Sequence, residues 1–175
     1  MTRTLFILAL SVATCAAFAQ QPFPAITGEF ADGRIARLPA EGAKGYTIIA
    51  LAFGQKAQPA LEEWFEPAYL RFVEKHGLFA TAYEAEVFFV PVFTGLNKAA
   101  YEPSMKRFRK SAAPGIVDRV LFVKAEFEAF KEALGLKGKD IPYFFVLDAE
   151  GRVIHREEGA FSDSKLEAIE DILLR

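Results

Sequence analysis

The chain has 175 residues, of which 52% are hydrophobic, and a formal net charge of −2 with its basic residues scattered along the sequence. This charge balance indicates neither nucleic acid nor an anionic membrane as a partner. There is one cysteine, Cys15, so the chain cannot form an internal disulfide or a site built from several thiolates. We therefore expect its stability to come from a hydrophobic core, to which 18 phenylalanines contribute.

The amino terminus is typical of a secretory signal peptide. Arg3 precedes the apolar run Leu5–Val12, and small residues follow as far as Ala17-Phe18-Ala19, which has the A-x-A form of a cleavage site. The apolar run is too short to span a bilayer. Cys15 follows Val12-Ala13-Thr14, which weakly resembles a lipoprotein signal, so lipidation of this cysteine is the alternative to its removal.

Cleavage after Ala19 defines the organisation that we expect. Residues 1–19 form the signal peptide, and residues 20–175 form a single domain that is periplasmic or secreted. The mature protein then has no cysteine and no membrane span, and its sulfur is limited to the thioether of Met105. We expect no thiol-disulfide oxidoreductase activity, because the attacking species in that chemistry is a thiolate.

The first half of the expected domain begins with strands. The Asp-Gly pair within Phe30–Ile35 favours a tight hairpin turn, and the apolar segment Tyr46–Phe53 predicts a strand buried on both faces. A helix is expected over Gln58–His76, kinked or restarted at Pro67 and ended by Gly77. Its apolar stripe consists of Leu61, Trp64, Phe65, Ala68, Tyr69 and Phe72.

The second half continues this alternation of strands and helices. The expected elements are a strand over Ala85–Phe93, a helix over Asn97–Ala112 interrupted near Pro103, a strand over Val117–Lys124, a helix over Ala125–Leu134 closed by Gly135, and a hairpin of Tyr143–Leu147 with Arg152–Arg156. A last helix is expected to start near Ser164, which forms a capping box with Glu167. This order of elements indicates an α/β fold with helices on both faces of a sheet.

Several of these segments together resemble the thioredoxin-like superfamily. Ile141-Pro142 before the strand Tyr143–Leu147, and Gly151-Arg152-Val153-Ile154 leading to Gly159, resemble its C-terminal half; IPYFFVLDAEGRV is the most specific stretch. The hairpin Phe30–Leu38 resembles the opening of the peroxiredoxin and extracytoplasmic thiol-reductase branch. The resemblance implies a thioredoxin-like α/β fold over nearly the whole mature chain: a mixed central sheet of four or five strands, helices on both faces and an N-terminal β-hairpin.

The resemblance also implies where a functional site would lie. In this superfamily two cysteines lie at the turn after the strand that ends here at Phe53, and a cis proline that matches Pro142 faces them; an X-Pro bond permits this geometry. This chain has Gln55-Lys56-Ala57-Gln58-Pro59 at the turn and so lacks the active-site cysteines. Trp64-Phe65-Glu66-Pro67 and the hairpin Asp148–Gly159 are similar to the cysteine-free relatives that assist mitochondrial ATP synthase assembly.

No other residues predict catalysis, a metal site or a cofactor. His76, at a helix end, and His155, in an edge hairpin, have no second metal ligand nearby in sequence. Asp163, within residues 162–164, is typical of a helix start and has no histidine base beside it. The basic run 106–110 is typical of the solvated face of a helix.

Two hypotheses about function follow. The first is an exported, redox-inactive thioredoxin-fold protein that binds a protein or peptide partner, as a chaperone or assembly factor, through a surface formed by Gln55, Lys56, Gln58 and Pro142. Strand addition beside the proline would need no thiol. The alternative is an enzyme with non-thiol chemistry, or a degenerate peroxiredoxin-like protein, on the same fold. The sequence favours a binding role, because it contains no recognisable set of residues for acid-base catalysis or metal binding.

Overall fold

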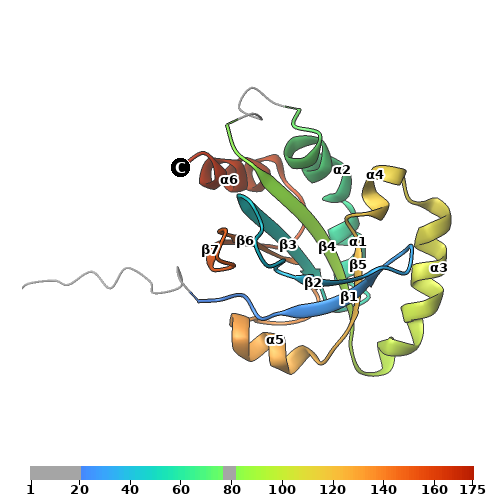
Figure 1. Cartoon of the computed structure of the whole chain (residues 1–175). Coiled ribbons are helices and arrows are strands. Elements are labelled where there is room, and N and C mark those ends of the chain that lie inside the picture. The colour runs from blue at the N-terminus through green and yellow to red at the C-terminus, as the bar shows by residue number, and fades with distance from the viewer. Residues whose placement is uncertain (1–20, 77–81) are drawn as a thin grey trace, which may run out of the picture.

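A seven-stranded mixed sheet forms the centre of the molecule, with helices on both faces (Figure 1). It is seen in a computed structural model that describes residues 21–76 and 82–175. The expected signal peptide, residues 1–19, and the expected helix end at Gly77 lie outside the described residues. The mixed sheet and the N-terminal hairpin confirm the expected fold class. The sheet is larger than expected because the hairpin joins it instead of standing apart.

The strands are β1 (Ile26–Phe30), β2 (Ile35–Leu38), β3 (Tyr46–Ala52), β4 (Ala85–Phe93), β5 (Leu121–Lys124), β6 (Tyr143–Leu147) and β7 (Val153–Glu158). Their order across the sheet is β2-β1-β5-β4-β3-β6-β7. The central strands β3, β4 and β5 are parallel to one another, whereas β6 is antiparallel to β3. The C-terminal ends of β3 and β4 and the N-terminal start of β6 therefore lie at the same end of the strands.

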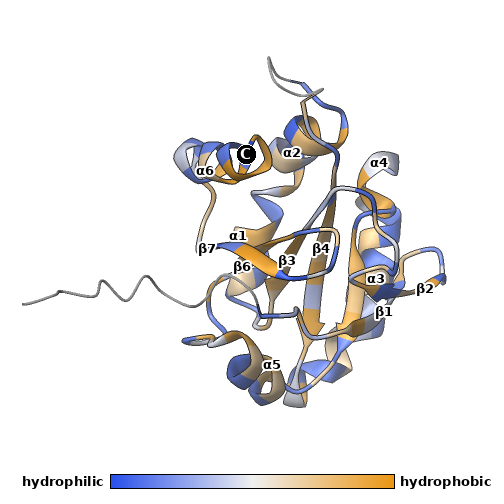
Figure 2. Ribbon diagram, turned by 60° about the vertical axis from the view of Figure 1, so that its left-hand side comes forward, coloured by the Kyte–Doolittle hydropathy of each residue, from blue (hydrophilic) through white to orange (hydrophobic). Residues whose placement is uncertain are grey.

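The alternation of side chains along the central strands builds two separate cores. Ile48 and Ala50 of β3 face one hydrophobic cluster, while Ile49 and Leu51 face the other, and all four are buried. The strands are therefore hydrophobic on both faces, as the almost wholly apolar segment Tyr46–Phe53 predicted. Figure 2 shows hydrophobic residues on the central strands and hydrophilic residues along the outer sides of the helices.

The helices are α1 (Ala57–Glu62), α2 (Phe65–Ala68), the π-helix η1 (Tyr69–Val73), the 3-10 helix η2 (Gly95–Ala100), α3 (Tyr101–Ser111), α4 (Pro114–Val117), α5 (Phe127–Leu134) and α6 (Asp163–Leu173). The segments α1 to η1, α3 and α6 bury residues in the first cluster, and α5 in the second. Helices near Gln58 and Ser164 thus pack on the sheet as expected.

Pro67 determines where the first long helical segment breaks, whereas Pro103 does not break the second. The helix expected over Gln58–His76 ends at Glu62 and restarts after Trp64, because the ring of Pro67 clashes with the carbonyl of Glu63 in a continuous helix. The interruption expected near Pro103 lies instead at Ala100, where η2 passes into α3. A proline is tolerated in the first turn of a helix, so Pro103 lies within α3 itself.

Two expected boundaries were wrong. The strand expected over Val117–Lys124 starts only at Leu121, because Pro114 provides the fixed φ of a first helical turn and starts α4. The last helix is capped by Ser162 and not by Ser164: Ser162 is extended, and its hydroxyl accepts a hydrogen bond from the main-chain N–H of Lys165.

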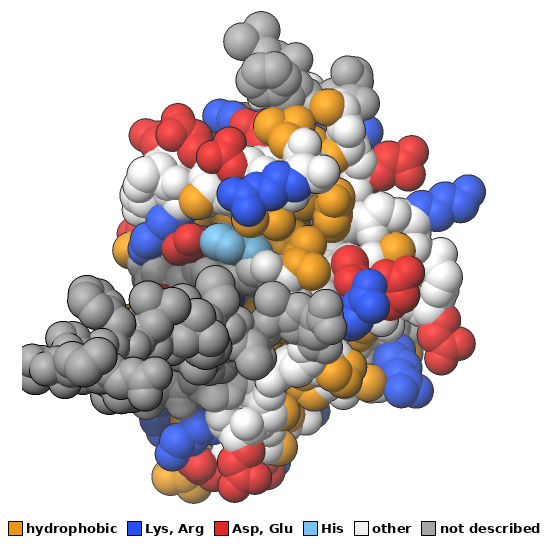
Figure 3. All heavy atoms as spheres, turned by 90° about the vertical axis from the view of Figure 1, so that its left-hand side faces the viewer, with side chains coloured by type: hydrophobic (Ala, Val, Ile, Leu, Met, Phe, Trp, Pro, Cys, Tyr) orange, Lys and Arg blue, Asp and Glu red, His pale blue; other side chains and the backbone are white. Residues whose placement is uncertain are grey.

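The sheet has two edge strands, β2 and β7. β7 carries the run His155-Arg156-Glu157-Glu158, and charged side chains on an edge strand disfavour pairing with another chain. Figure 3 shows the face of the molecule on this side, where acidic and basic side chains are mixed with hydrophobic ones.

The turn between β6 and β7 is organised by Asp148. Its carboxylate accepts hydrogen bonds from the main-chain N–H groups of Glu150 and Arg152, at 3.1 and 2.9 Å, and from Arg152 Nε at 2.7 Å. Partial burial raises the pKa of Asp148, but the hydrogen bonds and charge of Arg152 outweigh burial and hold the pKa below its usual range. The charged form therefore stabilises the folded state.

Asp148→Asn is expected to lower the free energy of unfolding by about 1 kcal/mol at pH 7, because the ion pair and one strong acceptor are lost. The pKa of Asp148 is depressed in the folded state, so this stabilisation is present above the ordinary carboxyl pKa and disappears as the pH falls below about 4. At low pH the free energies of unfolding of the wild type and the variant should therefore become equal. Urea titrations at several pH values measure this. Glu150→Gln, which alters only an exposed ion pair with Arg152, is the matched control. A difference in the free energy of unfolding that stayed constant down to pH 2 would contradict a stabilising role for the charged form of Asp148.

Candidate functional site

The turn after β3 is held by hydrogen bonds between its own main-chain groups. The N–H groups of Ala57 and Gln58 both donate to the carbonyl of Gly54, at 3.0 and 3.2 Å. Ala57 is fully buried, whereas Gln55 and Lys56 are exposed. The turn therefore needs no disulfide to hold its shape, and it presents two polar side chains to solvent. Because α1 has only six residues, its N-terminus offers a weak dipole for an anion.

The loop before β6 packs directly against this turn. A Cβ atom at Gly54 would lie 2.8 Å from the carbonyl oxygen of Lys139, so only glycine permits this approach. Lys56 Nζ lies 3.5 Å from Asp140 Oδ2, in an exposed pair that contributes little to stability. The turn and the loop thus lie against each other and form two sides of one surface.

The expectation of a cis bond at Pro142 was wrong: Ile141–Pro142 is trans, and among the described residues the cis bond is Leu38–Pro39. Trans is the lower-energy isomer of an X-Pro bond, and a cis bond needs contacts that favour it over trans. Pro142 is buried, and its carbonyl accepts a hydrogen bond from Gly159 N at 2.9 Å. Proline has no N–H, so Pro142 offers a partner little main-chain pairing.

The preceding residue, Ile141, is better placed for main-chain pairing. Within residues 21–76 and 82–175, its N–H and C=O groups form no hydrogen bond, and its side chain is 36% exposed.

A third segment, which the sequence reasoning missed, completes this surface. Gln55 Nε2 donates to Asn97 Oδ1 at 3.3 Å, which brings η2 beside the turn. Leu96 on η2 is 100% exposed. We name the exposed side chains of Gln55, Lys56, Leu96 and Ile141 the rim. Leu96 could not be found from its local pattern, because a single leucine near a glycine carries no sign of exposure.

Two amide groups behind the rim are unsatisfied. Gln58 Nε2 and Asn97 Nδ2 are buried, and neither has a hydrogen-bond partner among the described residues. Gln58 is half-buried and lines a groove between α1 and α3. Of the four residues predicted for partner binding, the structure therefore exposes Gln55 and Lys56 and buries Gln58 and Pro142 partly or wholly.

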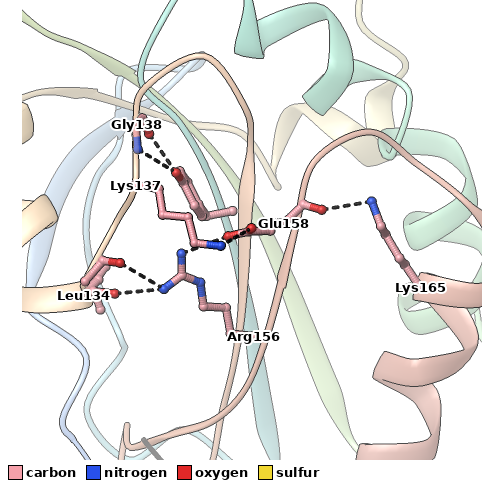
Figure 4. A network of polar contacts seen from close by, with 8 residues as sticks. Leu134, Lys137, Gly138, Arg156, Glu158 and Lys165 are labelled. Atoms are coloured by element: carbon pink, nitrogen blue, oxygen red, sulfur yellow. Dashed lines mark hydrogen bonds and ion pairs between the residues drawn. The ribbon is translucent and has the colours of Figure 1, made fainter.

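A polar network holds the loop before β6 in place (Figure 4). Arg156 donates to the carbonyls of Leu134 and Gly135 at the end of α5, at 3.1 and 3.3 Å, and to Glu158 Oε2 at 3.1 Å. Lys137 donates to Glu158 Oε1 at 3.0 Å, and this hydrogen bond, with the charge of Arg156, holds the pKa of Glu158 below its usual range against the effect of burial. The network therefore ties the end of α5 and the start of this loop to β7.

The two histidines pair with glutamates two residues away, and the basic run lies over a buried methionine. His155 pairs with Glu157 at 3.2 Å and His76 with Glu74 at 3.4 Å. Met105 is buried beneath the basic run 106–110, as expected for a solvated helix face. In the described part of the chain, no group of three or more His, Cys, Asp or Glu residues could hold a metal ion. Across residues 21–76 and 82–175, no helix combines the length and hydrophobicity needed to cross a bilayer.

No protein family model and no curated protein matches this chain in sequence. Solved structures do match. A thiol:disulfide interchange protein of the thioredoxin family from Chlorobium tepidum TLS is 20% identical, with a TM-score of 0.55 over 91% of this chain and 100% of that one. A peroxiredoxin-like protein from Aquifex aeolicus is 16% identical, with a TM-score of 0.52 over 88% and 86%.

A third match is BsSco, described as a member of the Sco family of cytochrome c oxidase assembly proteins with a disulfide switch. It is 12% identical, with a TM-score of 0.58 over 87% of this chain and 92% of that one. Identities at this level show the fold alone. The chain therefore has a thioredoxin-like fold and, because it holds a single cysteine, lacks the pair of active-site cysteines of that superfamily.

Proposed function

We propose that the protein is an exported, redox-inactive thioredoxin-fold protein that binds an extended segment of a protein partner at the rim, as an assembly or chaperone-like accessory factor. The observation that carries this proposal is the exposure of Leu96, at 100%, beside the turn where the superfamily has its cysteines. Leu96 lies on a segment that is hydrogen-bonded to this turn, and partly exposed Ile141 lies on the loop that packs against it, so both are apolar side chains that a partner could bury.

The rim offers a partner both apolar and main-chain contacts. Leu96 and Ile141 supply apolar surface from two sides of the turn, and the N–H and C=O of Ile141, which have no hydrogen-bond partner in the described part of the chain, can pair with an extended chain. Gln55 and Lys56 add exposed polar groups at the turn. None of these contacts requires a thiol, so the missing cysteines and a binding role are compatible. BsSco, a structural match with this fold, is described as a member of a family of cytochrome c oxidase assembly proteins, which is consistent with an assembly role.

A peptide library displayed on phage tests the proposal, because it samples many extended segments and needs no identified partner. The wild-type protein should enrich peptides with apolar residues, and Leu96→Ser should weaken their binding about tenfold, as expected when a buried leucine contact is lost. Its thermal midpoint should stay almost unchanged, because exposed substitutions away from special features cost less than about 0.5 kcal/mol.

Ile35→Ser is the matched control. Ile35 is also an exposed large hydrophobic residue, but it lies on β2, four strands away from β3 in the sheet. Peptide binding should therefore be the same as in the wild type. The protein should also fail to reduce insulin disulfides. Equal loss of binding in both variants, no enrichment by the wild type, or insulin reduction would each contradict the proposal.

A further inference from the structure

A groove with a volume of about 390 Å³ separates two ridges of opposite charge. We name Glu62 and Glu66, on α1 and α2, the acidic ridge, and Arg107 and Lys110, on α3, the basic ridge. Glu62 and Arg107 themselves line the groove. The link between α1 and α2 keeps helical backbone angles. The two charges of each ridge, three or four residues apart, are therefore neighbours on the helix surface.

The ridges carry charges that the same chain does not compensate. All four side chains are exposed, and none forms an ion pair with a described residue, although Glu62 and Arg107 border the same groove. By contrast, the nearby Lys124 pairs with Glu102 of α3 at 3.4 Å. Like charges at helical spacing repel each other. Each ridge is therefore free to attract an opposite charge on a second molecule.

The surface between the ridges is apolar and partly open to solvent. Phe65 and Phe108 meet edge to face at 6.4 Å, and these two rings and Ile116 line the groove while remaining partly exposed. An apolar centre flanked by charged side chains is the usual arrangement of a protein–protein interface. The charges beside the groove then decide which partner fits.

A second copy of this chain complements both ridges at once. A two-fold axis that points out of the groove exchanges its two sides, so the acidic ridge of one copy lies opposite the basic ridge of the other. Each contact then occurs twice, because a two-fold interface repeats every residue pair. A partner with a single sign of charge would instead attract one ridge and repel the other.

We propose that this face forms a symmetric dimer of the chain. Glu62 and Glu66 of one protomer pair with Arg107 and Lys110 of the partner subunit, and the two apolar grooves face each other between these pairs. This inference does not rest on partner binding at the rim, because none of the four rim residues belongs to a ridge or lines the groove.

Sedimentation velocity of the purified protein at increasing concentration measures the dimer dissociation constant. Arg107→Glu should raise this constant about a hundredfold, because two symmetry-related attractions become repulsions, each with an effect of about tenfold. Glu62→Arg should raise it equally. An increase in ionic strength from about 0.15 M to about 1 M should also weaken the wild-type dimer, because the Debye length falls from about 8 Å to about 3 Å.

An equimolar mixture of the two variants provides the sharpest test. A dimer of one Arg107→Glu chain with one Glu62→Arg chain places opposite charges at both symmetry-related contacts, so the mixture should dimerise about as tightly as the wild type. A variant that had failed to fold could not be rescued in this way. Glu132→Arg is the control: Glu132 is exposed on α5, which packs on the other face of the sheet, so this reversal should leave the dissociation constant unchanged.

Three results would overturn the inference. One is a wild-type protein that stays monomeric at every concentration, another is dimerisation that neither charge reversal weakens, and the last is a mixture of the two variants that remains monomeric. The rim proposal is tested separately. Leu96→Ser should dimerise like the wild type, and Arg107→Glu should bind the peptides selected at the rim as the wild type does.

Discussion

Trp64→Ala is expected to lower the free energy of unfolding by about 4 kcal/mol, as for other fully buried large aromatic residues. Trp64 has no exposed surface and lies 4.0 Å from the ring of Phe144 and 5.3 Å from that of Phe161, measured between centroids. Its Nε1 also donates to the carbonyl of Gly159 at 3.3 Å. Alanine would leave a cavity where α2, β6 and the segment before α6 meet.

The measurement is urea unfolding followed by far-ultraviolet circular dichroism, because Trp64 is the only tryptophan and its fluorescence disappears in the variant. Trp64→Phe keeps most of the aromatic volume but loses the hydrogen bond to Gly159, so it should cost about 1.5 kcal/mol. A loss below about 1 kcal/mol for the alanine variant would show that the surrounding core collapses into the space or is packed differently.

Glu170→Ala is expected to lower the free energy of unfolding by about 3 kcal/mol, because it leaves the partners of a buried carboxylate unpaired. Glu170 is 7% exposed, receives a hydrogen bond from Arg71 at 2.5 Å and accepts another from the hydroxyl of Tyr83 at 3.1 Å. Burial, and the charge of Glu170, raise the pKa of Tyr83, so its hydroxyl remains a donor. The contacts join α6 to η1 and to the segment before β4.

Thermal unfolding measures this effect, and the midpoint should fall by about 10 °C in a domain of this size. Glu167→Ala is the matched control, since Glu167 is exposed on the same helix and has no described ion pair. Glu170→Gln keeps an acceptor for Tyr83 but removes the charge facing Arg71, and its midpoint should lie between those of the other two variants. If Glu170→Ala behaved like Glu167→Ala, the network would be dispensable.

Much of the architecture could be predicted from local pattern. The apolar segment Tyr46–Phe53 became β3, buried on both faces, and the hairpin around Phe30–Ile35 formed β1 and β2. Gly135 adopts the left-handed conformation that ends α5, as its position after Leu134 indicated. These predictions hold because backbone preference and hydrophobic period depend on residues that are neighbours in sequence.

The candidate site was only partly predictable. Gln55 and Lys56 lie at the turn where the resemblance placed them, and Lys56 reaches Asp140 beside Pro142. Leu96 and Ile141 carried no local signal of their exposure. Whether a single apolar residue is buried depends on what packs over it, and here that is decided by chain segments about 40 residues apart.

The sequence by itself determined the strand and helix types, the two apolar faces of β3 and the absence of a second thiol, since each depends on composition or on periodicity within one segment. The tertiary structure alone decided the trans bond at Pro142, the meeting of Gln55 with Asn97 and the groove behind them. These features depend on which segments the order of strands in the sheet brings together at the same end of the strands. Their energies are sums of small long-range contacts, which no single stretch of sequence contains.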